Sequence, residues 1–134
     1  MIKRRMPFQA LQKAVCGLLK ECQTAPVYEY ITVNTKPPYI TFGDVDMLND
    51  SAKGMTLYSV GMNIHAYSRA HTRREVNEML DDVATILSSA LVDLSAESFQ
   101  VLDQDVGESH TSPSEIEGYG GMIRINFKIQ DMEE

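Results

Sequence analysis

The longest alternating stretch of the chain reads MTLYSVGMNIHAY at residues 55–67. One side carries Tyr58, Val60, Met62, Ile64 and Ala66, and the other carries Ser59, Gly61, Asn63 and His65. Strict alternation of this kind is typical of an antiparallel strand that buries one face and leaves the other accessible. The stretch therefore predicts a sheet with one covered face at the centre of the fold.

The segment that follows this strand predicts a helix that covers the apolar face. Its apolar side chains recur at three- and four-residue spacing, namely Val76, Met79, Leu80, Val83, Ile86, Leu87 and Leu91. Thr72 and Glu75 match a capping box, in which the hydroxyl and the carboxylate satisfy free backbone N–H groups at a helix start. We expect the helix to run from this box to Leu91 or Leu94.

The remaining elements follow from the same periodicities. Residues 7–22 predict an amphipathic helix, and residues 27–33, 39–42, 99–106 and 122–129 predict strands. The chain is thus expected to be α+β, with an antiparallel or mixed β-sheet, two α-helices packed on one face, and the order α-β-β-β-α-β-β. Residues 1–134 are expected to form a single domain, with flexible polar loops at about 44–54 and 107–121.

Composition narrows the class of protein. The chain has 43% hydrophobic residues and a formal net charge of −7, so it has material for a core and repels phosphate as a whole. No apolar run approaches the roughly 20 residues of a membrane-spanning helix, and the N-terminus lacks a signal peptide pattern, so no membrane partner is expected. Cys16 and Cys22 fall on different faces of the first helix, which favours reduced, buried thiols and a cytoplasmic setting.

No catalytic or metal-binding pattern emerges from the residues. His65, His71 and His110 do not form H-x-x-x-H, and the chain has no C-x-x-C or G-x-S-x-G. The acids at positions 44, 46 and 50 lack the glycine and the closing glutamate of a calcium loop. We therefore expect no enzyme activity, no metal and no cofactor.

One charged cluster stands out in this acidic chain. Arg69, His71, Arg73 and Arg74 crowd the start of the second helix, where positive charge opposes the helix macrodipole. The side chains either point to solvent or meet an acidic surface on a neighbouring copy. The candidate acids are Asp103, Asp105, Glu108, Glu115, Glu117 and the tail acids Asp131, Glu133 and Glu134. Head-to-tail contacts between such surfaces make rings when they close.

Three pieces of the chain, in this order, carry a resemblance to a known family. They are the amphipathic helix that runs into Ala25-Pro26-Val27-Tyr28, the strand Pro38-Tyr39-Ile40-Thr41-Phe42-Gly43, and Ile64-His65-Ala66-Tyr67-Ser68-Arg69 followed by a helix. This chain resembles the tail-completion or tail-terminator proteins of long-tailed bacteriophages and prophages, which include tail-to-head joining proteins. It departs from them at the second helix, which starts with basic residues where the family often has a glycine or an acid.

The resemblance implies a structural assembly protein with no cofactor and no catalysis. Such a subunit forms a ring, typically hexameric, that ends tail-tube polymerisation and provides the head-joining surface. The implied partners are further copies of the chain, the tail-tube protein and a head-completion or connector protein, with DNA only passing through the ring. The implied location is the virion tail, after assembly in the cytoplasm of the bacterial host.

Other functions stay open at this point. The chain also fits a head–tail connector or a minor capsid component. A small-ligand-binding regulatory module of ferredoxin-like type would need a glycine-rich strand-to-helix turn, and residues 67–72 contain no glycine. A small enzyme with a site between subunits would use Asp44, His65, His71 and Arg74.

Overall fold

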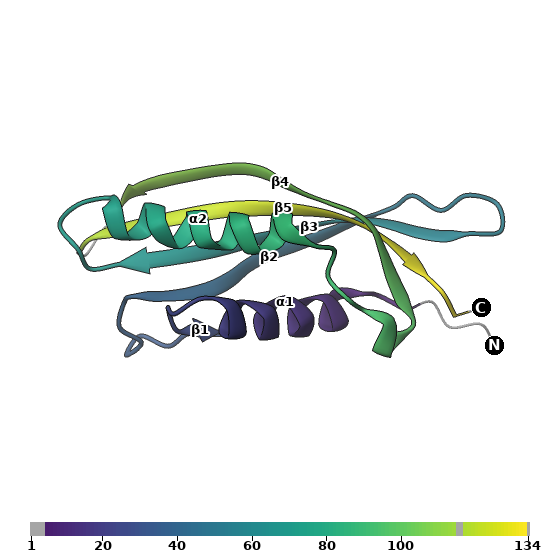
Figure 1. The fold of residues 1–134 in the computed structure, drawn as a ribbon, viewed down its shortest axis with the longest axis horizontal. Helices are drawn as coiled ribbons and strands as arrows, with labels where there is room; N and C mark the ends of the chain where they lie inside the picture. Colours follow the sequence, from purple (N-terminus) through teal and green to yellow (C-terminus); the bar gives the residue numbers. More distant parts are fainter. Residues whose placement is uncertain (1–4, 115–116, 134) are drawn as a thin grey trace.

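The fold is built on one five-stranded sheet in the order β1-β2-β3-β5-β4 (Figure 1). The computed structural model describes residues 5–114 and 117–133. The strands are β1 (Val27–Tyr28), β2 (Tyr39–Asn49), β3 (Thr56–Ser68), β4 (Phe99–Pro113) and β5 (Tyr119–Asp131). β1 runs parallel to β2 and the other neighbours run antiparallel, so the sheet is mixed.

Two helices supply the other layer, and Figure 1 shows α2 lying along the sheet with α1 beside it. They are α1 (Phe8–Cys22) and α2 (Arg74–Ser89), and a short 3₁₀ turn, η1 (Ser95–Glu97), follows α2. Both helices join the same hydrophobic cluster as the apolar faces of β3 and β5. The predicted α+β class and the order α-β-β-β-α-β-β are confirmed.

The alternation of the central strands produces the core. Met62 of β3 pairs with Ile125 of β5, and both side chains are fully buried against the helices. Val83 and Leu87 of α2 meet them from the other layer. Full burial of one such aliphatic side chain stabilises the fold by about 1.5–3 kcal/mol. Among the described residues, no helix covers the opposite face of the sheet, and its polar side chains are partly accessible.

The segment predicted as a loop at 44–54 is mostly strand. β2 continues to Asn49 and β3 begins at Thr56, so only a short turn separates them. A bulge between Phe42 and Val45 shifts the register, which puts Val45 opposite Met62 on the helix side. The high acid content misled the prediction because the acids stand on solvent-facing positions of a paired strand.

The segment predicted as a loop at 107–121 is also largely strand. β4 runs to Pro113 and β5 starts at Tyr119, so the turn is much shorter than expected. β4 is an edge strand with two bulges, after Val101 and after Val106, and most of its side chains face water. Its polar composition therefore reflects an edge position and not the absence of a strand.

Two other expectations are wrong in detail. The strand predicted at 27–33 ends at Tyr28, after which the chain leaves the sheet. The capping box does not form: α2 begins at Arg74, and its first turn has no side-chain cap in the described structure. Glu75 instead accepts a 2.6 Å hydrogen bond from the Ser68 hydroxyl. This hydrogen bond joins the end of β3 to the start of α2.

The structure bears on what was expected of the two cysteines and of a membrane-spanning helix. Both thiols are free in the described structure, and they lie on different faces of α1. Cys16 is buried, and burial raises the pKa of its thiol, whereas Cys22 is exposed in the last turn, contrary to expectation.

Among the described residues, no helix has the length and apolar character that a membrane crossing requires.

Candidate functional site

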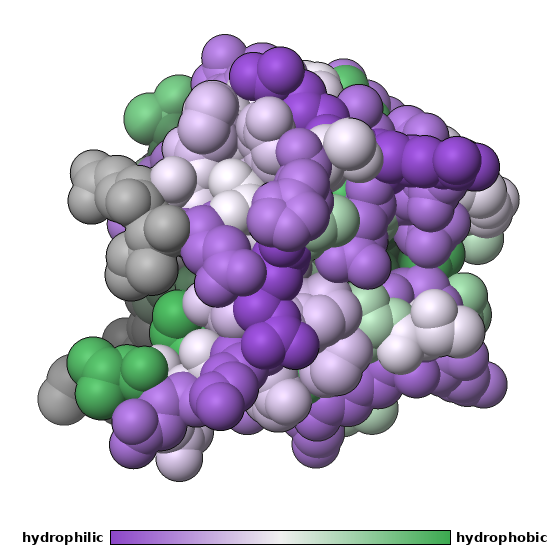
Figure 2. All heavy atoms as spheres, turned by 90° about the vertical axis from the view of Figure 1, so that its left-hand side faces the viewer, coloured by the Kyte–Doolittle hydropathy of each residue, from purple (hydrophilic) through white to green (hydrophobic). Residues whose placement is uncertain are grey.

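The predicted basic cluster lies at the end of the molecule where β3 stops and α2 begins, and Figure 2 shows a mostly hydrophilic surface there. Arg69, His71, Arg73 and Arg74 are all exposed. Arg74 pairs with Glu78 one turn along the helix at 3.2 Å, and the Arg73 guanidinium sits 5.0 Å from the centre of the Tyr119 ring. The cluster is thus an accessible basic surface, held partly in place by contacts within the chain.

The predicted acids do not form one patch. Asp103 and Asp105 stand on the helix-free face of β4, where they help to line a hollow of about 470 Å³. Glu108 is exposed at the second bulge of β4. Glu117 lies in the β4–β5 turn, which abuts the end of β3 beside the basic cluster. Glu115 lies outside the described residues.

Arg124 occupies the centre of the helix-free face. Its guanidinium donates to Asp46 at 2.7 Å and to Asn63 at 3.3 Å, which links β5 to β2 and β3. The hydrogen bond from Arg124 lowers the pKa of Asp46 and outweighs the opposing effect of burial. Gly61 makes this arrangement possible, because a Cβ there would lie 1.8 Å from the guanidinium.

An aromatic cluster covers the β1 side of the same face. The rings of Tyr28, Tyr39 and Tyr67 follow one another at centroid distances of 6.0 and 5.2 Å, and His65 stacks on Tyr67 at 6.3 Å. Burial lowers the pKa of His65, and the nearby Asp44 carboxylate opposes that shift. The lowered pKa favours the neutral form of the His65 imidazole.

These groups do not assemble into a reactive centre. No cluster of three or more potential metal ligands occurs within residues 5–114 and 117–133. Of the residues weighed for a site between subunits, Asp44 and His65 belong to the sheet face, and Arg74 is engaged by Glu78. The helix-free face presents the Arg124–Asp46 ion pair and aromatic rings, and the basic cluster presents three exposed arginines and a histidine.

Comparison with known proteins identifies the family. The model of the family "Tail completion protein gp17" matches residues 9–130, which include α1, α2 and nearly the whole sheet. The chain belongs to this family. No individual curated protein matches this tail completion protein.

Solved structures confirm the fold. A chain from the structure titled "Virion of native gene transfer agent (GTA) particle" superposes with a TM-score of 0.59 at 17% sequence identity. The match covers 92% of this tail completion protein and 87% of the other chain. At such low identity the likeness concerns the fold, whereas the role follows from the family: this protein is a structural component of a phage tail.

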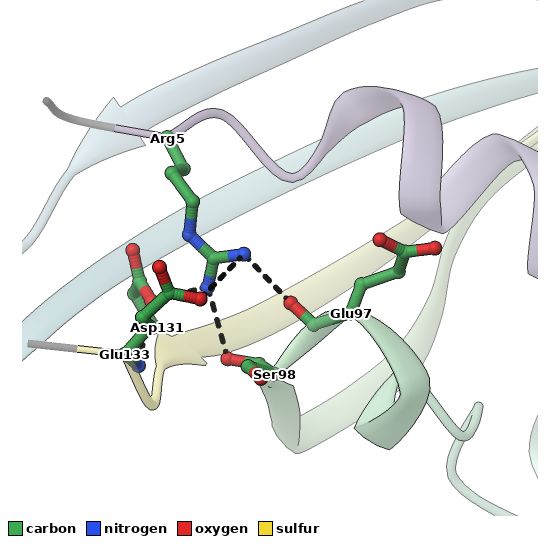
Figure 3. Close-up of polar contacts among 5 residues, drawn as sticks. All are labelled: Arg5, Glu97, Ser98, Asp131 and Glu133. Carbon is green, nitrogen blue, oxygen red and sulfur yellow. Dashed lines mark hydrogen bonds and ion pairs between the residues drawn. The ribbon is translucent and has the colours of Figure 1, made fainter.

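Arg5, which no sequence pattern singles out, joins the N-terminal segment to the end of β5 (Figure 3). Arg5 donates hydrogen bonds to the carbonyl oxygens of Glu97 and Ser98, at 2.8 and 3.1 Å, and to the Asp131 carboxylate at 2.6 Å. Its guanidinium also lies 4.2 Å from the centre of the Phe99 ring. Burial raises the pKa of Asp131, but the bonds from Arg5 and from a backbone N–H outweigh it and lower the pKa.

Two more surfaces are visible in the structure but do not follow from the sequence pattern. The segment after β1 carries Tyr30, Ile31 and Val33 exposed to solvent, although it had been interpreted as a strand. An apolar groove of about 740 Å³ runs between α1 and the end of α2. The alternating, β-rich residues at 27–33 predicted a strand, and their pattern does not indicate that the chain leaves the sheet after Tyr28.

Proposed function

We propose that this tail completion protein is a tail terminator, whose copies close into a ring, a hexamer, at the end of the tail tube. The ring stops tube polymerisation and offers the surface that the head joins. The match to the tail completion family over residues 9–130 carries the proposal. A ring of identical subunits needs two different contact surfaces on each copy, and the accessible surfaces of this chain supply candidates.

The basic cluster at the start of α2 is one side of the proposed contact. The other side is the acidic part of β4 on the next copy, with Asp103, Asp105 and Glu108. Glu117 is less suited to this role because its turn already lies beside the basic cluster of its own chain. Exposed ion pairs contribute about 0–1 kcal/mol each and weaken in salt, so this contact sets orientation more than strength.

The proposed ring explains the charge of the chain. The tail-tube protein meets one side of the ring and a head-completion or connector protein meets the other, with DNA passing through the opening. A net charge of −7 suits such a passage because it repels the DNA backbone. Assembly takes place in the host cytoplasm, and the finished ring stays in the virion tail.

Charge reversal tests the contact. Arg73→Glu with Arg74→Glu should dissociate the ring, and sedimentation velocity should show a shift towards monomer. The helix itself should tolerate the change, since acids at a helix start favour the macrodipole. Lys20→Glu with Lys53→Glu makes the same change in net charge at other exposed positions and should leave the ring intact. An unchanged sedimentation profile for the arginine variant would rule out this contact.

A further inference from the structure

The groove between the helices is lined mostly by small and aliphatic side chains. Its apolar lining includes Ala10, Ala14 and Gly17 from α1, Ile86 from α2, and Leu91 and Leu94 from the segment that follows. Positions 10, 14 and 17 lie on one side of a helix, since they are separated by about one turn each. The two helices therefore leave an open apolar channel where larger side chains would close it.

Gly17 is unexplained by the packing of a single chain. Glycine in the interior of a helix is unfavourable relative to alanine. A Cβ added at Gly17 would meet no atom within 4 Å, so no neighbour in the described chain requires its absence. The missing side chain keeps the groove open, which has a use only when something enters the groove.

The segment after β1 has the complementary character. Tyr30 is 81% exposed and Val33 is fully exposed, with Tyr28 and Ile31 also accessible. Four apolar side chains exposed within six residues are unusual on a soluble surface and typically mark a contact site.

This segment is ordered by its own hydrogen bonds. The Thr35 N–H donates to the Thr32 carbonyl oxygen at 3.0 Å, and the Thr32 N–H donates to the Thr35 hydroxyl at 3.0 Å. Val33 therefore stands within a closed turn, and a preorganised side chain loses less freedom on binding.

The segment of one chain does not fill the groove of the same chain, because Val33 is fully exposed. A surface patch that fits a groove elsewhere on the same molecule makes a head-to-tail contact, and such contacts form a ring when the rotation closes. The pairing is apolar, and charge does not direct it: the groove lining holds Lys13, Glu21, Asp93 and Glu97, whereas the segment carries one acid, Glu29, and one base, Lys36.

We propose that residues 28–36 of each copy dock into the groove between α1 and α2 of the next copy. This inference rests on the proposed ring and names its apolar contact, which stands apart from the charged contact described above. Tyr30 and Val33 enter the groove, and Gly17 admits them.

Two substitutions test the contact from its two sides by native mass spectrometry over a concentration series. Val33→Asp places a charge on the segment, and Gly17→Leu fills the groove; each should raise the concentration needed for ring formation at least tenfold. Both positions are exposed, so the fold should be retained, which circular dichroism checks. Gly17→Ala should weaken assembly less than Gly17→Leu, and Lys53→Asp serves as the control that should assemble like the wild type.

A disulfide tests whether the two surfaces meet. Cys22 lines the groove and is exposed, whereas Cys16 is buried, so only one natural thiol can react. Val33→Cys should give a ladder of linked subunits under mild oxidation, and the ladder should disappear with the added change Cys22→Ser. Lys53→Cys, in the β2–β3 turn, should give none.

The outcomes separate this contact from the ring itself. The contact is overturned, and the ring stands, when Val33→Asp and Gly17→Leu assemble as the wild type does. Loss of the ring in only one of the two variants also overturns the pairing, because the two surfaces then serve different partners. A wild-type chain that stays monomeric at every concentration overturns the proposed ring together with this contact.

Discussion

Replacing Arg5 with alanine should destabilise the fold far more than its position near the chain end suggests. Arg5 joins three parts of the chain, because it bonds η1 through two carbonyl oxygens and β5 through Asp131 (Figure 3). The Asp131 side chain is only 8% exposed, so loss of the guanidinium leaves a nearly buried carboxylate without its cation. Neither Arg5 nor Asp131 falls within the range that matches the family model.

The structure sets the size of the effect. A hydrogen bond to a charged partner contributes about 1.5–3 kcal/mol, and a bond to a neutral carbonyl oxygen about 1 kcal/mol. Partial exposure of Arg5 reduces these values, so we expect the free energy of unfolding to fall by about 3 kcal/mol. For a chain of this length that corresponds to a drop in Tm of about 12 °C.

Urea unfolding followed by circular dichroism measures the loss. Arg74→Ala is the matched control, because it removes an arginine–carboxylate pair whose side chains are 85% and 64% exposed. Such a pair contributes only about 0.3–0.5 kcal/mol. Equal losses in the two variants would refute the reasoning that the Arg5 bonds hold the chain ends together.

Three other expectations follow from the described contacts. The pKa of Asp131 is lowered in the folded state, so its ionised carboxylate stabilises the fold fully above the unfolded pKa of about 3.9. This stabilisation disappears as the pH falls through the folded pKa. Below about pH 5, the urea midpoint should therefore fall less steeply for Asp131→Asn than for the wild type. Gly118→Ala should cost well over 2 kcal/mol, since φ is +76° and a Cβ would collide with a backbone carbonyl, whereas Gly54→Ala, at φ +80° in open space, should cost about 1 kcal/mol in the same assay. Gly61→Ala should displace the guanidinium of Arg124 and return the pKa of its aspartate partner towards the ordinary value, which an NMR titration reads directly.

The central elements were predictable because their periodicity reports burial. β3, β5 and α2 each bury one face, so their apolar residues recur at fixed intervals in the sequence. The long edge strand β4 was underestimated because an edge strand packs little of its surface and therefore has little reason to alternate. The segment after β1 was predicted as a strand because its residues alternate and favour strands, but it does not pair with the sheet, and Tyr30 and Val33 are 81% and fully exposed.

The candidate surfaces were predictable only in part. The residues of the basic cluster are contiguous in sequence, so the cluster was predicted, and its side chains are exposed in the structure. The acids are distributed over two regions, and a groove lies between the helices. Both features depend on packing between distant segments, so the local sequence pattern does not predict them. The Arg5–Asp131 bond joins residues 126 positions apart, and nothing in the local pattern of either residue predicts it.

Native mass spectrometry of the wild-type chain over a concentration series tests the central claim most directly. We expect one dominant closed oligomer of 15.0 kDa subunits, a hexamer, whose size stays constant as concentration rises. A monomer at every concentration, or an open series of oligomers that lengthens with concentration, would contradict it.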